Sequence, residues 1–184
     1  MAEKSEPPPQ KESVRSQANG SASGSAPAQP GAAEKKPSEI HEFTVSATWM
    51  GDAMGCGSLR LPQGDLKVPI GGARALGGCG TGANPEELML GAIAACFIHT
   101  WAIFLKKLNI GYAEPSLRVS GDLGPDPAGG FKLLRATVHA RVPSPLLAQQ
   151  RTQIEKTLAL AEKYCIISKV AKAAMPLNVV VEEV

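Results

Sequence analysis

The stretch from Asn84 to Leu105 constrains the fold of this chain more than any other segment. Asn84 is a favourable N-cap residue, and Pro85 suits the first position of a helix. Glu86 and Glu87 complement the positive end of the helix dipole, a nearly unbroken apolar run follows, and two lysines close it. Because a helix that is apolar on all sides does not face water, we expect it to lie in a protein core or in an oligomer interface.

The pattern on both sides of this helix predicts strands and shorter helices. Upstream we expect three strands of an antiparallel meander, and downstream a hairpin, two helices and a final strand. The expected segments are residues 41–49, 58–61, 65–68, 117–121, 131–142, 144–160, 167–174 and 177–181. Strands do not alternate regularly with helices, so the expected class is α+β, with antiparallel sheets packed around the long central helix.

The first 38 residues differ in composition from the rest of the chain. They are rich in Pro, Ser, Ala, Gly, Gln, Lys and Glu, and the first aromatic residue is Phe43. Such a segment buries too little apolar surface to offset the entropy lost on ordering. We therefore predict a disordered tail over residues 1–38 and one domain over residues 39–184.

Charge and hydropathy narrow the choice of partners and compartment. The formal net charge is +2, which argues against a nucleic acid or an anionic membrane as the partner. We expect no transmembrane helix, because no apolar run reaches the required length, and no secretory signal, because the N-terminus lacks an apolar segment. These observations predict a cytoplasmic protein whose cysteines are kept reduced.

Cys96, in the middle of the apolar helix, is the first candidate for chemistry. Burial raises the pKa of a thiol, so a reactive Cys96 needs a cation nearby, for which Arg74 and His99 are candidates. A buried arginine needs a carboxylate, and Glu86 is one, but about ten residues of helix place it about 15 Å from Cys96 at roughly 1.5 Å per residue. Either the helix kinks at Gly91 or a second subunit completes the site.

The other cysteines leave alternatives open. Cys165 is able to resolve an oxidised Cys96, whereas Cys56 and Cys79 lie among glycines and are interpreted as small loop residues. No C-x-x-C pair is present, so we expect no zinc site, and we expect no bound cofactor. Cys96 could also be core filler, His99 a hydrogen-bonded core or interface histidine, and Arg74 a solvated loop residue.

Two segments of this chain resemble those of a known family. The run from Asn84 through Pro-Glu-Glu-Leu to Ala-Ala-Cys96-Phe, with Cys165 and Ser168-Lys169 downstream, resembles the osmotically inducible protein C and organic hydroperoxide resistance (OsmC/Ohr) family. The resemblance covers residues 42–184. Two departures stand out: Ile166 replaces the usual proline after the second cysteine, and residues 51–57 contain no arginine, so that Arg74 approximates the position used in the OsmC branch.

The resemblance implies a function as well as a fold. Family members are thiol-dependent peroxidases, typically intertwined homodimers with active sites at the subunit interface. Cys96 then matches the thiol that attacks an organic hydroperoxide, Cys165 the resolving thiol, Arg74 the activating cation and Glu86 its orienting carboxylate, with a dithiol or a lipoyl-bearing protein as the reductant. A non-peroxidatic binding protein with the same fold, or a thiol redox sensor, is the alternative.

Overall fold

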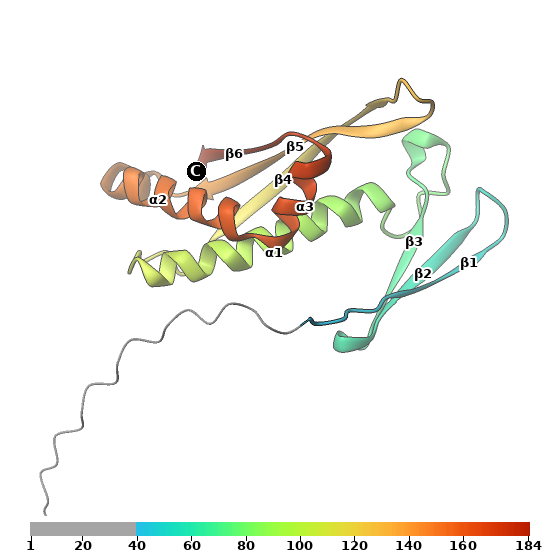
Figure 1. Cartoon of the computed structure of the whole chain (residues 1–184), viewed down its shortest axis with the longest axis horizontal. Coiled ribbons are helices and arrows are strands. Elements are labelled where there is room, and N and C mark those ends of the chain that lie inside the picture. The colour runs from blue at the N-terminus through green and yellow to red at the C-terminus, as the bar shows by residue number, and fades with distance from the viewer. Residues whose placement is uncertain (1–39) are drawn as a thin grey trace, which may run out of the picture. The chain divides into compact units, whose positions relative to one another are not determined.

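The computed structural model describes residues 40–184, so the predicted tail over residues 1–38 lies outside the described part (Figure 1). Three strands, one long helix, two strands, two helices and one strand follow one another along the chain. The elements are β1 (Ser46–Met50), β2 (Cys56–Leu61), β3 (Leu66–Gly71), α1 (Pro85–Lys107), β4 (Ser116–Pro125), β5 (Phe131–Val142), α2 (Ser144–Tyr164), α3 (Ile166–Ala174) and β6 (Leu177–Glu183). The expected order of strands and helices is confirmed, and the class is α+β.

The first sheet is the antiparallel meander β1-β2-β3. A short 3-10 turn over Pro62–Gly64 joins β2 to β3, and Asp65 closes it in the left-handed conformation with φ of 47°. All residues of β1 are exposed within the chain, including the large apolar side chains of Trp49 and Met50. The meander is therefore correctly predicted, but much of its apolar surface is uncovered in the single chain.

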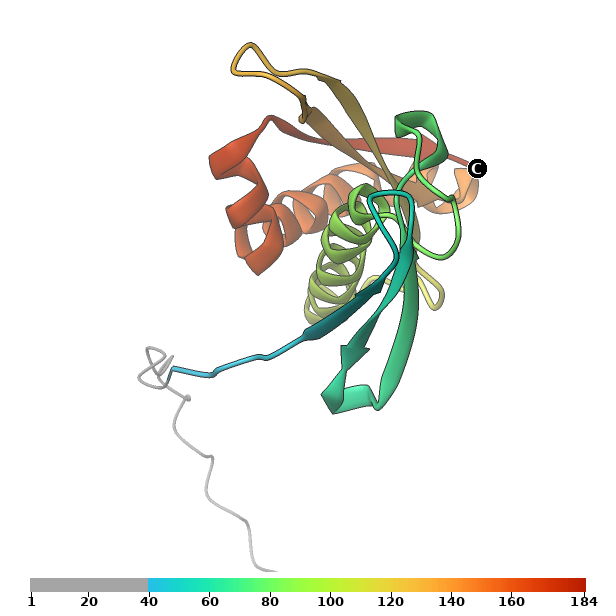
Figure 2. The ribbon, with the colours of Figure 1, turned by 90° about the vertical axis from the view of Figure 1, so that its right-hand side faces the viewer.

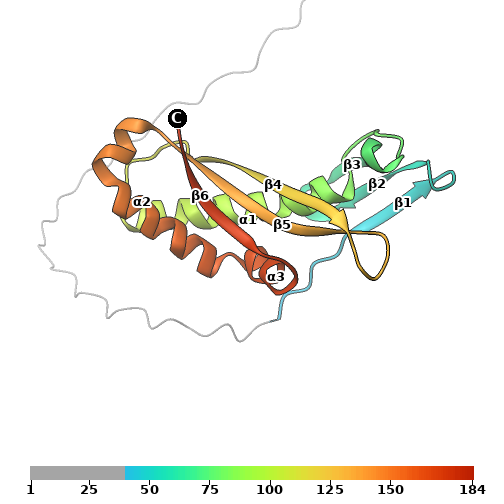
Figure 3. The ribbon, with the colours of Figure 1, turned by 90° about the horizontal axis from the view of Figure 1, so that it is seen from above.

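The second sheet, in the order β4-β5-β6, is mixed rather than wholly antiparallel. β4 and β5 form the expected hairpin, with a register shift between Asp122 and Leu123, whereas β6 runs parallel to β5. A parallel neighbour requires a crossover connection, and α2 and α3 provide it. α1 and α2 lie side by side beneath one face of this sheet (Figures 2 and 3).

The core lies between this sheet and the helices. Alternate residues of β5 are buried because successive side chains of a strand point to opposite faces: Ala136, Val138, Ala140 and Val142. From α1 a stripe with a four-residue spacing meets them: Ile93, Phe97, Trp101 and Leu105. The Trp101 indole N–H donates to Thr157 Oγ1 of α2 at 2.9 Å, and this hydroxyl donates to the Ile154 carbonyl at 2.7 Å.

The α1 helix begins as the sequence predicts but is less buried than expected. Asn84 and Glu87 form a capping box in which each side chain bonds the backbone N–H of the other residue. Only the stripe facing the core is fully buried, and residues such as Gly91, Ala95 and Ile103 are exposed. By length and composition α1 could cross a membrane, which corrects the expectation that no run is long enough. Its packing against α2, α3 and β4 is that of a core helix.

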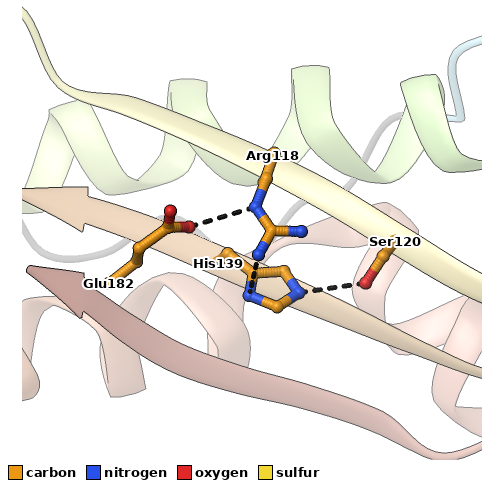
Figure 4. Close-up of polar contacts among 4 residues, drawn as sticks. All are labelled: Arg118, Ser120, His139 and Glu182. Atoms are coloured by element: carbon orange, nitrogen blue, oxygen red, sulfur yellow. Dashed lines mark hydrogen bonds and ion pairs between the residues drawn. The ribbon is translucent and has the colours of Figure 1, made fainter.

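The outer face of the second sheet carries a line of polar side chains (Figure 4). Arg118 bonds Glu182 Oε2 through Nε at 3.1 Å and His139 Nδ1 through Nη2 at 3.1 Å, while His139 Nε2 bonds Ser120 Oγ at 2.9 Å. A guanidinium only donates, so the Nδ1 of His139 accepts and the proton of the neutral ring lies on Nε2. Because a cation rather than a carboxylate meets Nδ1, this line lacks the polarity of a Ser-His-acid triad.

Candidate active site

Cys96 and Cys165 come from different helices. Cys96 lies near the middle of α1, is half-buried, and precedes Phe97 of the core stripe. Cys165 is fully buried between α2 and α3, where its sulfur accepts the Ser168 N–H at 3.4 Å and serves as the N-cap of α3. Since α1 packs against α3, the tertiary structure brings the two cysteines to the same place.

The Cys96 and Cys165 thiols influence each other, and their pKa values shift in opposite directions. The Cys96 and Cys165 side chains lie close enough for each to change the pKa of the other, and both are free thiols. The Cys165 thiol favours the ionised form of Cys96, whereas Cys96 favours the protonated form of Cys165. The two cysteines thus lie near each other within one chain, and their roles as attacking and resolving thiols stay predictions.

The pKa of Cys96 lies below its ordinary value of 9.0. Burial raises this pKa, as expected for a thiol on an apolar helix. The opposing contributions together outweigh burial: the hydrogen bond from Cys165, the backbone N–H groups of Ile167 and Ile166, and the hydroxyl of Thr100. Thr100 contributes least, and its single hydroxyl proton is donated to the Cys96 carbonyl at 2.8 Å. Cys96 is therefore the better nucleophile of the pair.

The pKa of Cys165 moves in the opposite direction. Burial raises it first, and the hydrogen bond with Cys96 raises it further, whereas the contributions of Ser168 that lower it are smaller. The Ser168 hydroxyl is buried without a partner of hydrogen-bonding geometry. Cys165 is thus kept as a protonated thiol until a reaction at Cys96 changes its surroundings.

After the Cys165 thiol, the amino terminus of α3 contributes most to lowering the pKa of Cys96, and sequence reasoning missed it. Ile166 and Ile167 are the first residues of this helix, and their N–H groups have no partner within it. The positive end of the helix dipole adds to these hydrogen bonds. A proline at position 166 could not supply such an N–H, so the departure noted in the sequence provides one of the donors.

The predicted cations are not among the groups that act on Cys96 within the chain. Arg74 lies in a short 3-10 turn, Arg74–Leu76, where it is exposed and where its side chain runs close over Gly80. His99 is also exposed, on the side of α1 away from the core stripe. Within residues 40–184, no ion pair joins Arg74 to Glu86. The roles assigned to Arg74 and Glu86 remain predictions.

Glu86 has a buried carboxylate oxygen that lacks a partner within the described residues. It lies in the first turn of α1, and its Oε2 atom is buried without a hydrogen-bond partner among the described residues. A buried carboxylate oxygen without a partner is costly. α1 runs from Pro85 to Lys107 without interruption, so no kink at Gly91 carries Glu86 to Cys96. The kink at Gly91 is therefore wrong, and a contribution from a second subunit stays a prediction.

Neither thiol belongs to a metal centre in the described part of the chain. Over residues 40–184, no three His, Cys, Asp or Glu side chains are grouped in a way that could hold a metal ion. What the arrangement offers chemically is an activated thiolate beside a protonated thiol, which are the two parts of a dithiol redox site.

Comparisons with known proteins show which family this chain is similar to. The family model for OsmC-like proteins matches residues 77–180, which include both Cys96 and Cys165. The organic hydroperoxide resistance protein-like 1 of Staphylococcus epidermidis is 31% identical over 105 residues, covering 57% of this chain and 73% of that protein. The uncharacterized protein YmaD of Bacillus subtilis is 27% identical over 143 residues, covering 75% of this chain and 91% of that protein.

The solved structures agree on the fold. The organic hydroperoxide resistance protein OsmC of Legionella pneumophila superposes with a TM-score of 0.63 at 25% identity, covering 78% of this chain and 99% of that one. An OsmC-like protein of Mycoplasma pneumoniae superposes with a TM-score of 0.65 at 18% identity, covering 79% and 99%. The architecture described above is therefore shared with solved proteins over nearly their whole length.

Proposed function

Because this chain belongs to the OsmC-like protein family, we propose that it is a thiol-dependent peroxidase that reduces organic hydroperoxides. The observation that carries the proposal is the contact between Cys96 and Cys165, in which the pKa of the first thiol is lowered and that of the second is raised. The names of the relatives support organic hydroperoxide as the substrate class.

The first step is oxidation of Cys96. Its thiolate attacks the distal oxygen of the hydroperoxide, a sulfur–oxygen bond forms, and the oxygen–oxygen bond breaks. Cys96 becomes a sulfenic acid, and the alkoxide that leaves takes a proton to become the alcohol. The donors at the start of α3 favour this step because they keep Cys96 ionised before the attack.

The second step closes a disulfide. The Cys165 sulfur attacks the sulfur of the Cys96 sulfenic acid, and the hydroxyl leaves with the thiol proton as water. An external dithiol or a lipoyl-bearing protein then reduces the disulfide by thiol–disulfide exchange and restores both thiols. The electrons come from that reductant, so the cycle includes no bound cofactor, and the reducing cytoplasm is the compartment that we propose for it.

The surroundings of Cys96 favour an apolar substrate. Ile166, whose N–H acts on Cys96, is 70% exposed, Val170 one turn later in α3 is 61% exposed, and Ala95 precedes Cys96 on α1 and is also exposed. Apolar side chains attract the organic part of an alkyl or lipid hydroperoxide, whereas hydrogen peroxide gains nothing from them. This is the physical reason to propose organic hydroperoxides as the preferred oxidants.

The proposal includes a homodimer. β1 is exposed throughout, one side of α1 is uncovered, and a carboxylate oxygen of Glu86 is buried without a partner. A second copy of the chain would cover this apolar surface and supply a donor to Glu86, for which the exposed Arg74 of that copy is suited. In this arrangement the pair of Arg74 and Glu86 forms across the interface.

The proposal is tested by turnover of cumene hydroperoxide with dihydrolipoamide as the reductant. Cys96→Ser should abolish turnover, and Cys165→Ser should still form a sulfenic acid that dimedone traps, without the disulfide. The matched control is the double variant Cys56→Ser/Cys79→Ser, which should keep full activity. Equal activity in the wild type, Cys96→Ser and Cys165→Ser would refute the proposal.

The absence of a guanidinium near Cys96 in the described chain favours one alternative, a binding protein of the same fold. An apolar pocket with an unreactive thiol would then bind its ligand without turnover. The rate of alkylation of Cys96 as a function of pH separates the two. A Cys96 pKa at or above its ordinary value supports the binding protein, and a lower one supports the peroxidase.

A further inference from the structure

A second pair of cysteines lies in the first sheet and the loop that follows it. Cys56 begins β2 and is paired across the sheet with Gly71, the last residue of β3. Cys79 lies in the loop between β3 and α1, and its Sγ is 3.2 Å from the Sγ of Cys56. Both thiols are free and half-buried. The interpretation as small loop residues is confirmed for Cys79 and wrong for Cys56, which begins β2, and the fold places the two sulfurs in contact.

The backbone around Cys79 is built to hold this contact. A Cβ at Gly71 would lie 2.5 Å from Cys79 Sγ, so the missing side chain at position 71 leaves the space that the sulfur occupies. The loop is tied back to β3 at both sides of Cys79: the Gly80 N–H donates to the Gly72 carbonyl at 3.0 Å, and the Ala83 N–H donates to the Pro69 carbonyl at 2.9 Å. The missing side chain at Gly71 and these backbone hydrogen bonds together place the Cys79 sulfur next to Cys56.

The pKa values of Cys56 and Cys79 shift in opposite directions, as in a redox-active dithiol. The backbone N–H of Thr81 lowers the pKa of Cys79, and the hydrogen bond from Cys56 lowers it further. That same hydrogen bond is the largest contribution raising the pKa of Cys56, with burial second. Cys79 is therefore the nucleophile and Cys56 the proton donor. Within residues 40–184 no third ligand joins them, which argues against a metal site.

We propose that Cys56 and Cys79 form a second, reversible disulfide by exchange with small-molecule disulfides such as oxidised glutathione. The Cys79 thiolate attacks one sulfur of the small disulfide, and the other half leaves as a thiolate that takes up a proton. The Cys56 thiol then loses its proton and attacks Cys79 in the mixed disulfide, releasing the second small thiol. Two protein thiols are oxidised and one small disulfide is reduced to two thiols.

The proposed disulfide has a structural consequence for the loop. The covalent ring it closes contains β3 and the turn that carries Arg74. Oxidation therefore restrains the Arg74 turn relative to β2, and reduction releases it. Since Cys96 and Cys165 take no part in this exchange, the inference does not depend on the peroxidase activity.

The test uses the full chain with Cys96→Ser/Cys165→Ser, which keeps only Cys56 and Cys79. The chain is incubated with oxidised glutathione and analysed by intact mass and by mapping of non-reduced peptides. We expect a mass loss of about 2 Da, the disappearance of both titratable thiols, and a linked peptide containing residues 56 and 79, all reversed by a dithiol. The matched control, which also carries Cys79→Ser, should not lose this mass.

Three outcomes would overturn the proposal: two thiols that still titrate after incubation, stable glutathione adducts on both cysteines, or a link between two chains. Mapping of the same peptides in the wild-type chain keeps the test valid if the variant fails to fold. In the wild type the two disulfides appear as separate linked peptides, so a missing Cys96–Cys165 link with an intact Cys56–Cys79 link refutes only the proposed function.

Discussion

Replacing Ile166 by proline removes one hydrogen-bond donor from the Cys96 thiolate and changes little else. Ile166 is the first residue of α3, where proline is well tolerated because the N–H has no partner inside the helix. The preceding residue, Cys165, has φ of −63° and ψ of 118°, an extended conformation compatible with a following proline. The variant should therefore fold, while the N–H that Ile166 directs at Cys96 is lost.

The expected effect follows from the strength of one hydrogen bond to a charged acceptor. Such a bond contributes about 1.5–3 kcal/mol, and because Cys96 is half-buried we take the lower end of this range. Its loss raises the pKa of Cys96, and a difference of about 1.4 kcal/mol corresponds to about tenfold in the thiolate population at a fixed pH below the pKa. The rate of the first oxidation should fall by about the same factor.

The assay is the alkylation rate of Cys96 by iodoacetamide as a function of pH, with the modified peptide quantified by mass spectrometry. The matched control is Ile166→Ala, which keeps the backbone N–H and removes only a side chain that is 70% exposed. We expect the Cys96 profile of the alanine variant to match the wild type and that of the proline variant to shift to higher pH.

Two results would refute this reasoning. If the proline variant keeps the wild-type profile, the N–H of Ile166 does not stabilise the thiolate. If both variants shift to higher pH by the same amount, the side chain rather than the N–H is responsible, and the amino terminus of α3 is not the activating group.

Three further predictions concern stability and are measured by urea unfolding. Thr157→Val leaves the buried indole N–H of Trp101 without an acceptor and should cost about 1–3 kcal/mol, whereas Thr157→Ser should cost much less. Asn84→Ala removes the capping box with Glu87 and should cost about 1 kcal/mol, whereas Asn84→Asp should retain most of it. The backbone N–H of Ala128 holds the pKa of Asp126 below its ordinary value of 3.8, so the stability that Asp126 contributes is present above pH 3.8 and is lost as the pH falls through its pKa in the folded protein. The difference between wild type and Asp126→Ala should accordingly be present at pH 7 and shrink in acid.

Each stability prediction has an outcome that contradicts it. Equal stabilities of Thr157→Val and Thr157→Ser would mean that the Trp101 N–H finds another partner. An Asn84→Ala variant as stable as Asn84→Asp would mean that the capping box does not stabilise α1. A difference for Asp126→Ala that grows as the pH falls would reverse the sign argued from its pKa.

Local signals in the sequence were sufficient for most of the elements. The N-cap, the proline and the acidic first turn located the start of α1 at Pro85, and Lys107 ends it as expected. The hairpin of β4 and β5 followed from alternation and from the Gly- and Pro-rich link between them. These features depend on hydrogen bonds and side-chain periodicity within a few residues, so the sequence alone carries them.

The candidate site was only partly predictable. The sequence singled out Cys96 and Cys165 through their resemblance to a family motif, but the activating group expected from the sequence was a charged side chain. In the structure, backbone N–H groups at the start of α3 act on Cys96 instead. Because nearly every residue type has a backbone N–H, the sequence does not reveal which one will act on a distant side chain.

What the sequence by itself determined is the set of elements and the candidate thiols, because both are encoded in short-range patterns. Only the tertiary structure decided that β6 runs parallel to β5, that Arg74 is exposed and that Cys56 touches Cys79. Each of these depends on how segments distant in sequence pack together. The environment of a sulfur, and with it the pKa that governs its reactivity, is set by that packing rather than by its neighbours in the chain.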